Sequence, residues 1–196
     1  MKKDIILSGV GGQGILSIAA VIGTAAIESG LFMKQSEVHG MSQRGGAVQS
    51  HLRFSDQPVF SDLIPRGSCD MILSVEPMES LRYLDFLAPG GWLVTNTKPF
   101  RNIEDYPGEE ELYGAISTVS NHLMINADDI AAEAGSRKVS NIVMVGAASG
   151  YLGISFEALE SSIRSIFGRK GDEVIRMNLD ALTAGKNAAS EYLSNR

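Results

Sequence analysis

Cysteine is nearly absent from this chain, whose 196 residues include only Cys69. A single thiol excludes an internal disulfide and an iron–sulfur cluster held only by cysteines of the same chain. We therefore expect a chain that has no redox centre of its own and that suits a reducing compartment. Cys69 precedes an apolar segment, so we expect its side chain to be inert packing in the core.

Long apolar runs are also missing. The most apolar stretch, residues 15–27, is too short to span a bilayer and contains Ser17, Gly23 and Thr24. Residues 1–4 lead into only three strongly apolar residues, which does not make a signal peptide. We therefore expect a cytoplasmic protein without a membrane partner.

Excess positive charge and the common metal and nucleotide motifs are absent as well. The chain has 17 Lys and Arg against 23 Asp and Glu, and its net charge of −6 disfavours nucleic acid as a partner. It has no HExxH, CxxC or Walker A pattern, so neither a zinc site nor a P-loop is predicted. We assign no metal ligands.

The composition that is present, 44% apolar and 20% charged, is that of an ordinary globular domain. Short apolar segments typical of strands alternate with helical patterns, and the end of the chain is helical. This order predicts one α/β domain over residues 1–196, a Rossmann-like three-layer fold with a largely parallel sheet and a C-terminal helical layer. We expect strands near 4–9, 31–34, 47–54, 70–75, 92–96 and 122–126, and helices near 14–29, 80–87, 109–118 and 128–134, with further helices after residue 140.

Residues 9–14 hold four glycines directly after the first expected strand. A strand that turns sharply into a helix leaves backbone N–H groups free to face an anion. The spacing satisfies the glycine part of the dinucleotide fingerprint, but that fingerprint also needs an acid at the end of the second strand. Glu28 lies in the expected helix, so NAD binding is disfavoured. The residues assigned here to cofactor binding are Gly9, Gly11, Gly12, Gln13 and Gly14.

The segment 36–46 packs an acid, an imidazole, an amide and a guanidinium between glycines. In one interpretation it is a surface loop whose charged side chains satisfy one another. In the interpretation that we favour, it faces an anionic cofactor or substrate at the carboxyl ends of the strands, where ligands collect in open α/β sheets. We expect His39 to orient a ligand rather than to act as a base. The candidate catalytic residues are Glu37, His39 and Arg44, and the further candidate cofactor-binding residues are Gln43, Gly45 and Gly46.

Other polar residues are interpreted as structural. The segment 47–54 alternates like a half-buried strand, and we expect His51 and Arg53 on its polar face to be solvated or at an interface. Glu76 precedes Pro77 at the end of an expected strand. It is either a site residue at that end of the sheet or an acid that stabilises a helix N-terminus.

Taken together, several motifs resemble the gamma-type subunits of 2-oxoacid:ferredoxin oxidoreductases, and most closely the beta subunit of indolepyruvate ferredoxin oxidoreductase. The similarity runs along nearly the whole chain, and the polar segment 36–46 is far more specific than the glycine loop. The motifs that carry it are Ser8–Ile15, Ser36–Gly46, Ser50–Phe54, Ser61–Gly67, Glu76–Arg82 and the stretch that Asn141 opens before Val143–Ala147.

The resemblance implies a subunit of an enzyme that decarboxylates an aryl 2-oxoacid, forms an acyl-CoA and reduces ferredoxin. It also implies a larger partner subunit that carries thiamine diphosphate and the iron–sulfur clusters, with CoA as co-substrate. In thiamine-dependent reactions the cofactor carries the carbanion, and the protein supplies orientation and electrostatic stabilisation. The two glycine-bearing segments therefore either complete the thiamine diphosphate pocket or cradle CoA phosphates. The competing interpretation is a stand-alone nucleotide- or CoA-binding regulatory module of Rossmann-like fold.

Overall fold

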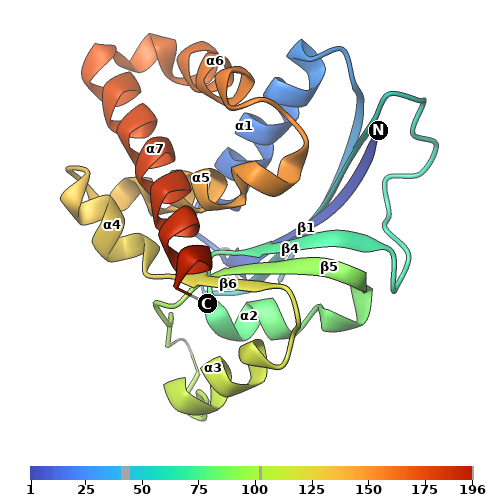
Figure 1. Cartoon of the computed structure of the whole chain (residues 1–196), viewed down its shortest axis with the longest axis vertical. Helices are drawn as coiled ribbons and strands as arrows, with labels where there is room; N and C mark the ends of the chain where they lie inside the picture. Colours follow the sequence, from blue (N-terminus) through green and yellow to red (C-terminus); the bar gives the residue numbers. More distant parts are fainter. Residues whose placement is uncertain (41–44, 102, 196) are drawn as a thin grey trace.

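The computed structural model describes residues 1–40, 45–101 and 103–195. Within these residues, six strands form one sheet in the order β2-β3-β1-β4-β5-β6 (Figure 1). β3 runs antiparallel to both of its neighbours, and the other neighbouring pairs are parallel, which confirms the expected sheet. The strands are β1 (Lys2–Val10), β2 (Phe32–His39), β3 (Ala47–Ser55), β4 (Cys69–Ser74), β5 (Leu87–Asn96) and β6 (His122–Ile125).

Helices cover both faces of the sheet and make three layers (Figure 1). One face carries α1 (Ile15–Glu28), α4 (Ala127–Glu133), α5 (Ser140–Leu152), α6 (Phe156–Phe167) and α7 (Asp172–Ser194). The other face carries α2 (Pro77–Leu81) and α3 (Glu109–Ser117). Short 3₁₀ segments are η1 (Leu84–Phe86), η2 (Arg137–Val139) and η3 (Gly168–Lys170). No helix in the described ranges is long and apolar enough to cross a membrane.

The central strands are buried on both faces, as parallel strands between two helical layers must be. Ile5 and Leu7 of β1 point into the larger core beneath α1 and α5. Ile6 points to the opposite face and packs with Ile72 and Leu93 in the smaller core beneath α2 and α3. Alternate residues of β1 therefore belong to the two cores. The glycine loop begins where this anchored strand ends.

The C-terminal layer rests on a close crossing of α5 and α7. A Cβ on Gly146 would lie 2.0 Å from the Leu182 carbonyl oxygen, and one on Gly185 would lie 1.9 Å from the Val143 carbonyl oxygen. Real Cβ atoms do not approach backbone so closely, so the two helix backbones touch here only because both positions are glycine. α5 in turn begins beside the glycine loop.

The structure corrects the expected loop at 36–46. β2 continues to His39, so Glu37 and His39 lie in a strand rather than in a loop. Ser36 pairs with His51, and His39 pairs with Val48, in the antiparallel register of β2 and β3. Polar residues rarely indicate a strand by themselves, but a partner strand that satisfies their backbone groups overrides this local preference.

The structure also corrects the expected helix at 80–87. α2 ends at Leu81, η1 follows it, and β5 begins at Leu87 rather than at Trp92. β5 therefore includes residues 89–91, which lie before the strand that the sequence predicts near 92–96. A Cβ on Gly91 would lie 2.9 Å from the Cys69 carbonyl oxygen, so the glycine allows β5 to approach β4 at the point where their register shifts.

Candidate functional site

The loop between β1 and α1 is closed by its own glutamine. The Val10 N–H donates to Oε1 of Gln13 (2.7 Å), and the Gln13 N–H donates to the Val10 carbonyl (3.1 Å). Gly12 (φ +100°) and Gly14 (φ +82°) adopt backbone conformations that other residues rarely take. The carbonyl oxygen of the Gln13 side chain is thus used within the loop, where it fixes the turn.

The glycines of this loop serve different purposes. A Cβ on Gly9 would lie 2.4 Å from Cγ2 of Val75, and one on Gly14 would lie 2.5 Å from Nδ2 of Asn141. These two glycines allow β4 and α5 to pack against the loop. A Cβ on Gly12 would meet no atom within 4 Å. Gly12 is therefore a loop glycine that faces open space.

The structure brings the two glycine-bearing segments together. The Gly11 N–H donates to the Gly46 carbonyl (2.8 Å), which joins the β1 end to the chain entering β3. The Gly40 N–H donates to the Ala47 carbonyl (2.8 Å) and keeps the two ends of the segment 40–47 close. Two of the site residues predicted in the segment 36–46, Gln43 and Arg44, lie outside the described residues.

A cavity of about 360 Å³ lies where these segments meet. The first turn of α1 reaches it, and no hydrogen bond is found within the described residues for the N–H groups of Gly12, Gly14, Ile15 and Leu16. Such N–H groups at a helix N-terminus attract anions. The residues around the cavity are Val10, Gly11, Gly12, Gly14, Ile15, Leu16, Ser17, Glu37, His39 and Val48.

Glu37 contributes a buried carboxylate to this cavity. Its side chain is 10% exposed, and neither of its oxygens makes a hydrogen bond within the described residues. Nε2 of His39 lies 2.5 Å from Oε1 of Glu37, an ion-pair distance without hydrogen-bond geometry, and the His39 side chain is half exposed. A buried carboxylate without donors is costly, so this group is poised to accept a hydrogen bond from a ligand. Among the described residues, the Ser8 hydroxyl is the only other buried side-chain group whose oxygen or nitrogen makes no hydrogen bond.

A larger cavity, of about 470 Å³, lies at the opposite edge of the sheet between β6, α4 and α7. His122 and Tyr192 meet there edge to face. No buried side-chain oxygen or nitrogen around it lacks a hydrogen bond within the described residues. We therefore place the candidate site at the smaller cavity, where the described groups are still open to a ligand.

Glu76 is a structural anchor. It is fully buried at the N-terminus of α2, where its carboxylate accepts from the Glu79 N–H (2.8 Å). The same carboxylate accepts from the Phe100 N–H (3.2 Å) and from the Tyr106 hydroxyl. Burial and the Glu76 carboxylate raise the pKa of Tyr106, which keeps this hydroxyl a donor. Glu76 thus ties the chain after β5 to the carboxyl end of β4.

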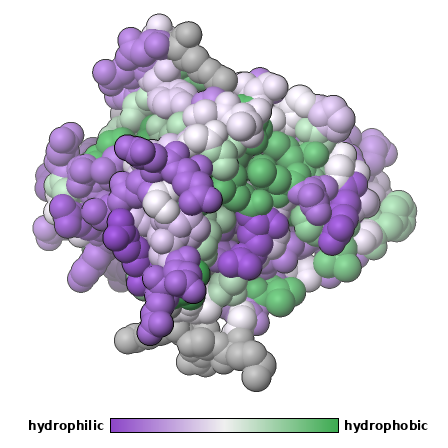
Figure 2. Space-filling model, turned by 90° about the horizontal axis from the view of Figure 1, so that it is seen from below, coloured by the Kyte–Doolittle hydropathy of each residue, from purple (hydrophilic) through white to green (hydrophobic). Residues whose placement is uncertain are grey.

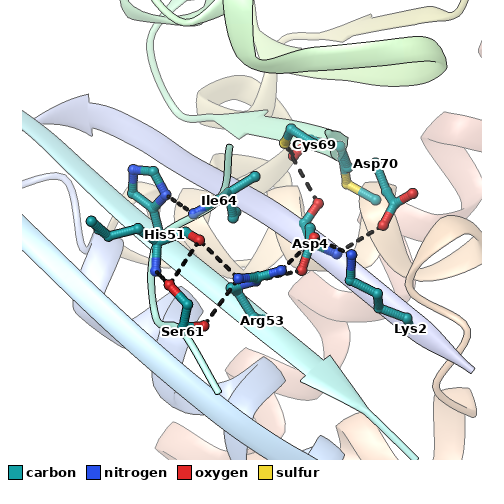
Figure 3. A network of polar contacts seen from close by, with 10 residues as sticks. Lys2, Asp4, His51, Arg53, Ser61, Ile64, Cys69 and Asp70 are labelled. Atoms are coloured by element: carbon teal, nitrogen blue, oxygen red, sulfur yellow. Dashed lines mark hydrogen bonds and ion pairs between the residues drawn. The ribbon is translucent and has the colours of Figure 1, made fainter. Parts of the chain in front are cut away.

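His51 and Arg53 are buried, which corrects the expectation that they are solvated or at an interface. Arg53 binds the fully buried Asp4 through two hydrogen bonds, Nε to Oδ1 (2.8 Å) and Nη2 to Oδ2 (3.0 Å) (Figure 3). Nδ1 of His51 accepts from the Ile64 N–H (3.0 Å). The loop between β3 and β4 covers this face of β3, and sequence alternation alone gives no sign of such a cover.

Burial and the neighbouring Arg53 guanidinium lower the pKa of His51. The imidazole is therefore neutral near pH 7, as its role as an acceptor requires. Cys69, beside the same network, is fully buried, and burial raises its pKa to about 12. These facts confirm that Cys69 is inert packing.

Comparisons with known proteins agree with the motifs. A family model described as pyruvate ferredoxin/flavodoxin oxidoreductase matches residues 4–188. Indolepyruvate oxidoreductase subunit IorB of Pyrococcus horikoshii is 38% identical over 205 residues, which cover 99% of this chain and 100% of the relative. The resemblance to this group of subunits is thereby confirmed.

Solved structures share the fold. The gamma subunit of the keto/oxoacid ferredoxin oxidoreductase of Geobacter sulfurreducens superposes with a TM-score of 0.71 at 27% identity, covering 96% of this chain and 99% of that one. The 2-oxoglutarate:ferredoxin oxidoreductase of Magnetococcus marinus, solved with 2-oxoglutarate, coenzyme A and succinyl-CoA, gives a TM-score of 0.77 at 24% identity. There the match covers 97% of this chain but 31% of the other. On these grounds the chain belongs to the pyruvate ferredoxin/flavodoxin oxidoreductase family.

Proposed function

We propose that this chain is the smaller subunit of a cytoplasmic indolepyruvate:ferredoxin oxidoreductase. The complex decarboxylates indolepyruvate or another aryl pyruvate, forms the acyl-CoA and reduces ferredoxin. The full-length similarity to the Pyrococcus horikoshii IorB subunit supports this choice among 2-oxoacids. In this proposal residues 1–196 form one domain whose role is to bind and orient rather than to carry electrons.

The cavity beside the glycine loop is the observation that supports a CoA-binding role. Open N–H groups at Gly12, Gly14 and Ile15 suit an anionic phosphate. The buried Glu37 carboxylate suits a hydroxyl or amide N–H donor on the same ligand. CoA has both kinds of group, and when bound it supplies the thiol that accepts the acyl group. Arg44 and Gln43 stay candidates for further contacts with its phosphates.

The chemistry of the side chains supports a division of labour between subunits. An iron–sulfur cluster needs several thiolates, whereas this chain offers one buried thiol whose pKa is raised to about 12. Thiamine diphosphate and the clusters therefore belong to the larger subunit in this proposal, and ferredoxin receives electrons there. The chain by itself has no turnover.

The experiment is to purify this chain, its co-expressed larger subunit and their complex, and to assay each with indolepyruvate, CoA and an electron acceptor. Only the complex should turn over. Glu37→Gln removes the charge but keeps the shape, and it should raise the KM for CoA while the KM for indolepyruvate is unchanged. Ile27→Ser, an exposed change at the far end of α1, is the matched control and should alter neither constant.

Three results would contradict the proposal. Turnover by the isolated chain would show that it does not depend on a partner. Failure to form a complex with any thiamine-dependent subunit, together with tight binding of NAD(H) by the isolated chain, would favour a regulatory module. A changed KM for indolepyruvate with an unchanged KM for CoA would move the cavity from CoA to the 2-oxoacid.

A further inference from the structure

The loop between β3 and β4, residues 56–68, lies at the surface yet is firmly held. Nη1 of Arg53 donates to the carbonyls of Ser61 (3.0 Å) and Leu63 (2.8 Å). Nζ of Lys34, from β2, donates to the Phe60 carbonyl (3.2 Å). Because Arg53 is itself clamped by the buried carboxylate of Asp4, this stretch of backbone is anchored to the interior of the sheet (Figure 3).

This anchored loop presents apolar side chains to solvent. Phe60 is 90% exposed and Leu63 is 55% exposed. Phe32, 52% exposed, lies two residues before Lys34 on the same face of β2, and Lys34 reaches the Phe60 carbonyl. We call Phe32, Phe60 and Leu63 the Phe60 patch. The loop lies at the right of Figure 1, and apolar side chains gather in the middle and on the right of the view from below in Figure 2.

An exposed aromatic side chain on a rigid loop has the properties of a binding hot spot. Burying such a side chain is favourable, and most of the energy of an interface comes from a few large side chains of this kind. A loop that is already ordered loses little conformational entropy when a partner binds. The anchoring by Arg53 thus prepares the Phe60 patch for a protein partner.

The patch and the candidate site lie at the two ends of β2. β2 is an edge strand of the sheet. It begins at Phe32, in the patch, and ends at His39, in the cavity beside the glycine loop. At about 3.3 Å per residue these ends are roughly 23 Å apart, well within the reach of one partner surface. A chain that lies along the edge of β2 therefore contacts the patch while it closes over the cavity.

We propose that the Phe60 patch is the docking surface for the larger, thiamine-bearing subunit. This inference rests on the proposed function. In the Magnetococcus marinus structure the same fold is 31% of a longer chain, so further polypeptide is permanently joined to it there. A second copy of this chain is disfavoured as the occupant because each copy carries a net charge of −6.

The test compares a double variant, Phe60→Ser with Leu63→Ser, with the control Leu193→Ser. Leu193 is 40% exposed on α7, which packs near β6 at the opposite edge of the sheet. Thermal melting of each isolated chain checks that the fold is intact. Binding to the purified larger subunit is measured by sedimentation. The double variant should lose at least about 30-fold in affinity, the loss expected for a hot spot, and the control should bind like the wild type.

Each other result has a defined meaning. If the wild-type chain and the double variant bind the larger subunit equally well, the Phe60 patch is not the docking surface, while the proposed function stands. If the wild-type chain does not bind the larger subunit at all, the proposed function itself is wrong. If the double variant loses self-association but keeps the larger subunit, the patch belongs to a second copy and the proposal is overturned.

Discussion

The contact between α5 and α7 makes a sharp prediction about two glycines on one helix. Gly146→Ala would place a Cβ 2.0 Å from the Leu182 carbonyl oxygen, and this atom is backbone that cannot swing away. To reach an ordinary contact of 3.4 Å, α7 must move by about 1.4 Å. Gly150, one turn later on α5, is the matched control, because a Cβ there would meet no atom within 4 Å.

The two substitutions should change the free energy of unfolding in opposite directions. Overpacking of this kind costs about 3 kcal/mol, and the better helix propensity of alanine offsets about 1 kcal/mol of it. Gly146→Ala should therefore lower the free energy of unfolding by about 2 kcal/mol. Gly150→Ala has the propensity gain without the clash and should raise that free energy by about 0.5–1 kcal/mol.

Urea unfolding followed by circular dichroism measures both changes in the isolated chain. The two variants should differ by about 3 kcal/mol, which corresponds to roughly 6–12 °C in melting temperature for a chain of this size. If Gly146→Ala were as stable as Gly150→Ala, the close approach of the two helices would be wrong. The reasoning would also fail if both variants were stabilised by the same amount.

Three further predictions concern polar residues. Arg53→Met leaves the Asp4 carboxylate buried without its main partner and should destabilise the chain by about 3–5 kcal/mol in urea; adding Asp4→Leu should recover most of this loss. Stability should fall as the pH drops through 6.5, because the unfolded chain then protonates His51 while the folded chain, with its lowered pKa, does not; this part of the pH dependence should vanish in His51→Gln, and an unchanged profile would contradict the neutral acceptor role. Arg44→Lys should impair turnover of the complex, and Arg44→Ala should impair it more, with little change in melting temperature; wild-type kinetics for Arg44→Ala would remove Arg44 from the site.

The sequence was sufficient for the order of elements because hydrophobic period and turn residues are local signals. The alternation of strands and helices predicts the three layers, and the glycines after Leu7 predict a sharp strand-to-helix turn. That turn is present, and a backbone hydrogen bond joins it to the second glycine segment. What each glycine does was not predictable, because Gly9 meets Val75 and Gly14 meets Asn141, residues far away along the chain.

Local sequence periodicity could not indicate which polar residues are buried. Arg53 lies on what reads as the polar face of β3, but the segment 56–68 folds over it and Asp4 faces it from β1. One signal was available, since Asp4 is an acid directly before the apolar, buried residues 5–7 of β1. An acid in such a strand needs a cationic partner, and the next strand in space supplies Arg53.

Because Cys69 is buried, the natural sequence is also suited to chemical labelling at a single introduced cysteine. Cys69 is the one thiol in the chain, it is fully buried, and its pKa is raised to about 12. Burial and the raised pKa keep this thiol protonated at pH 8, so maleimides and iodoacetamides have almost nothing to attack in the folded chain. A cysteine introduced at an exposed position can then carry a fluorophore alone, without prior removal of native thiols. Any slow labelling of Cys69 itself reports how often β4 opens to solvent.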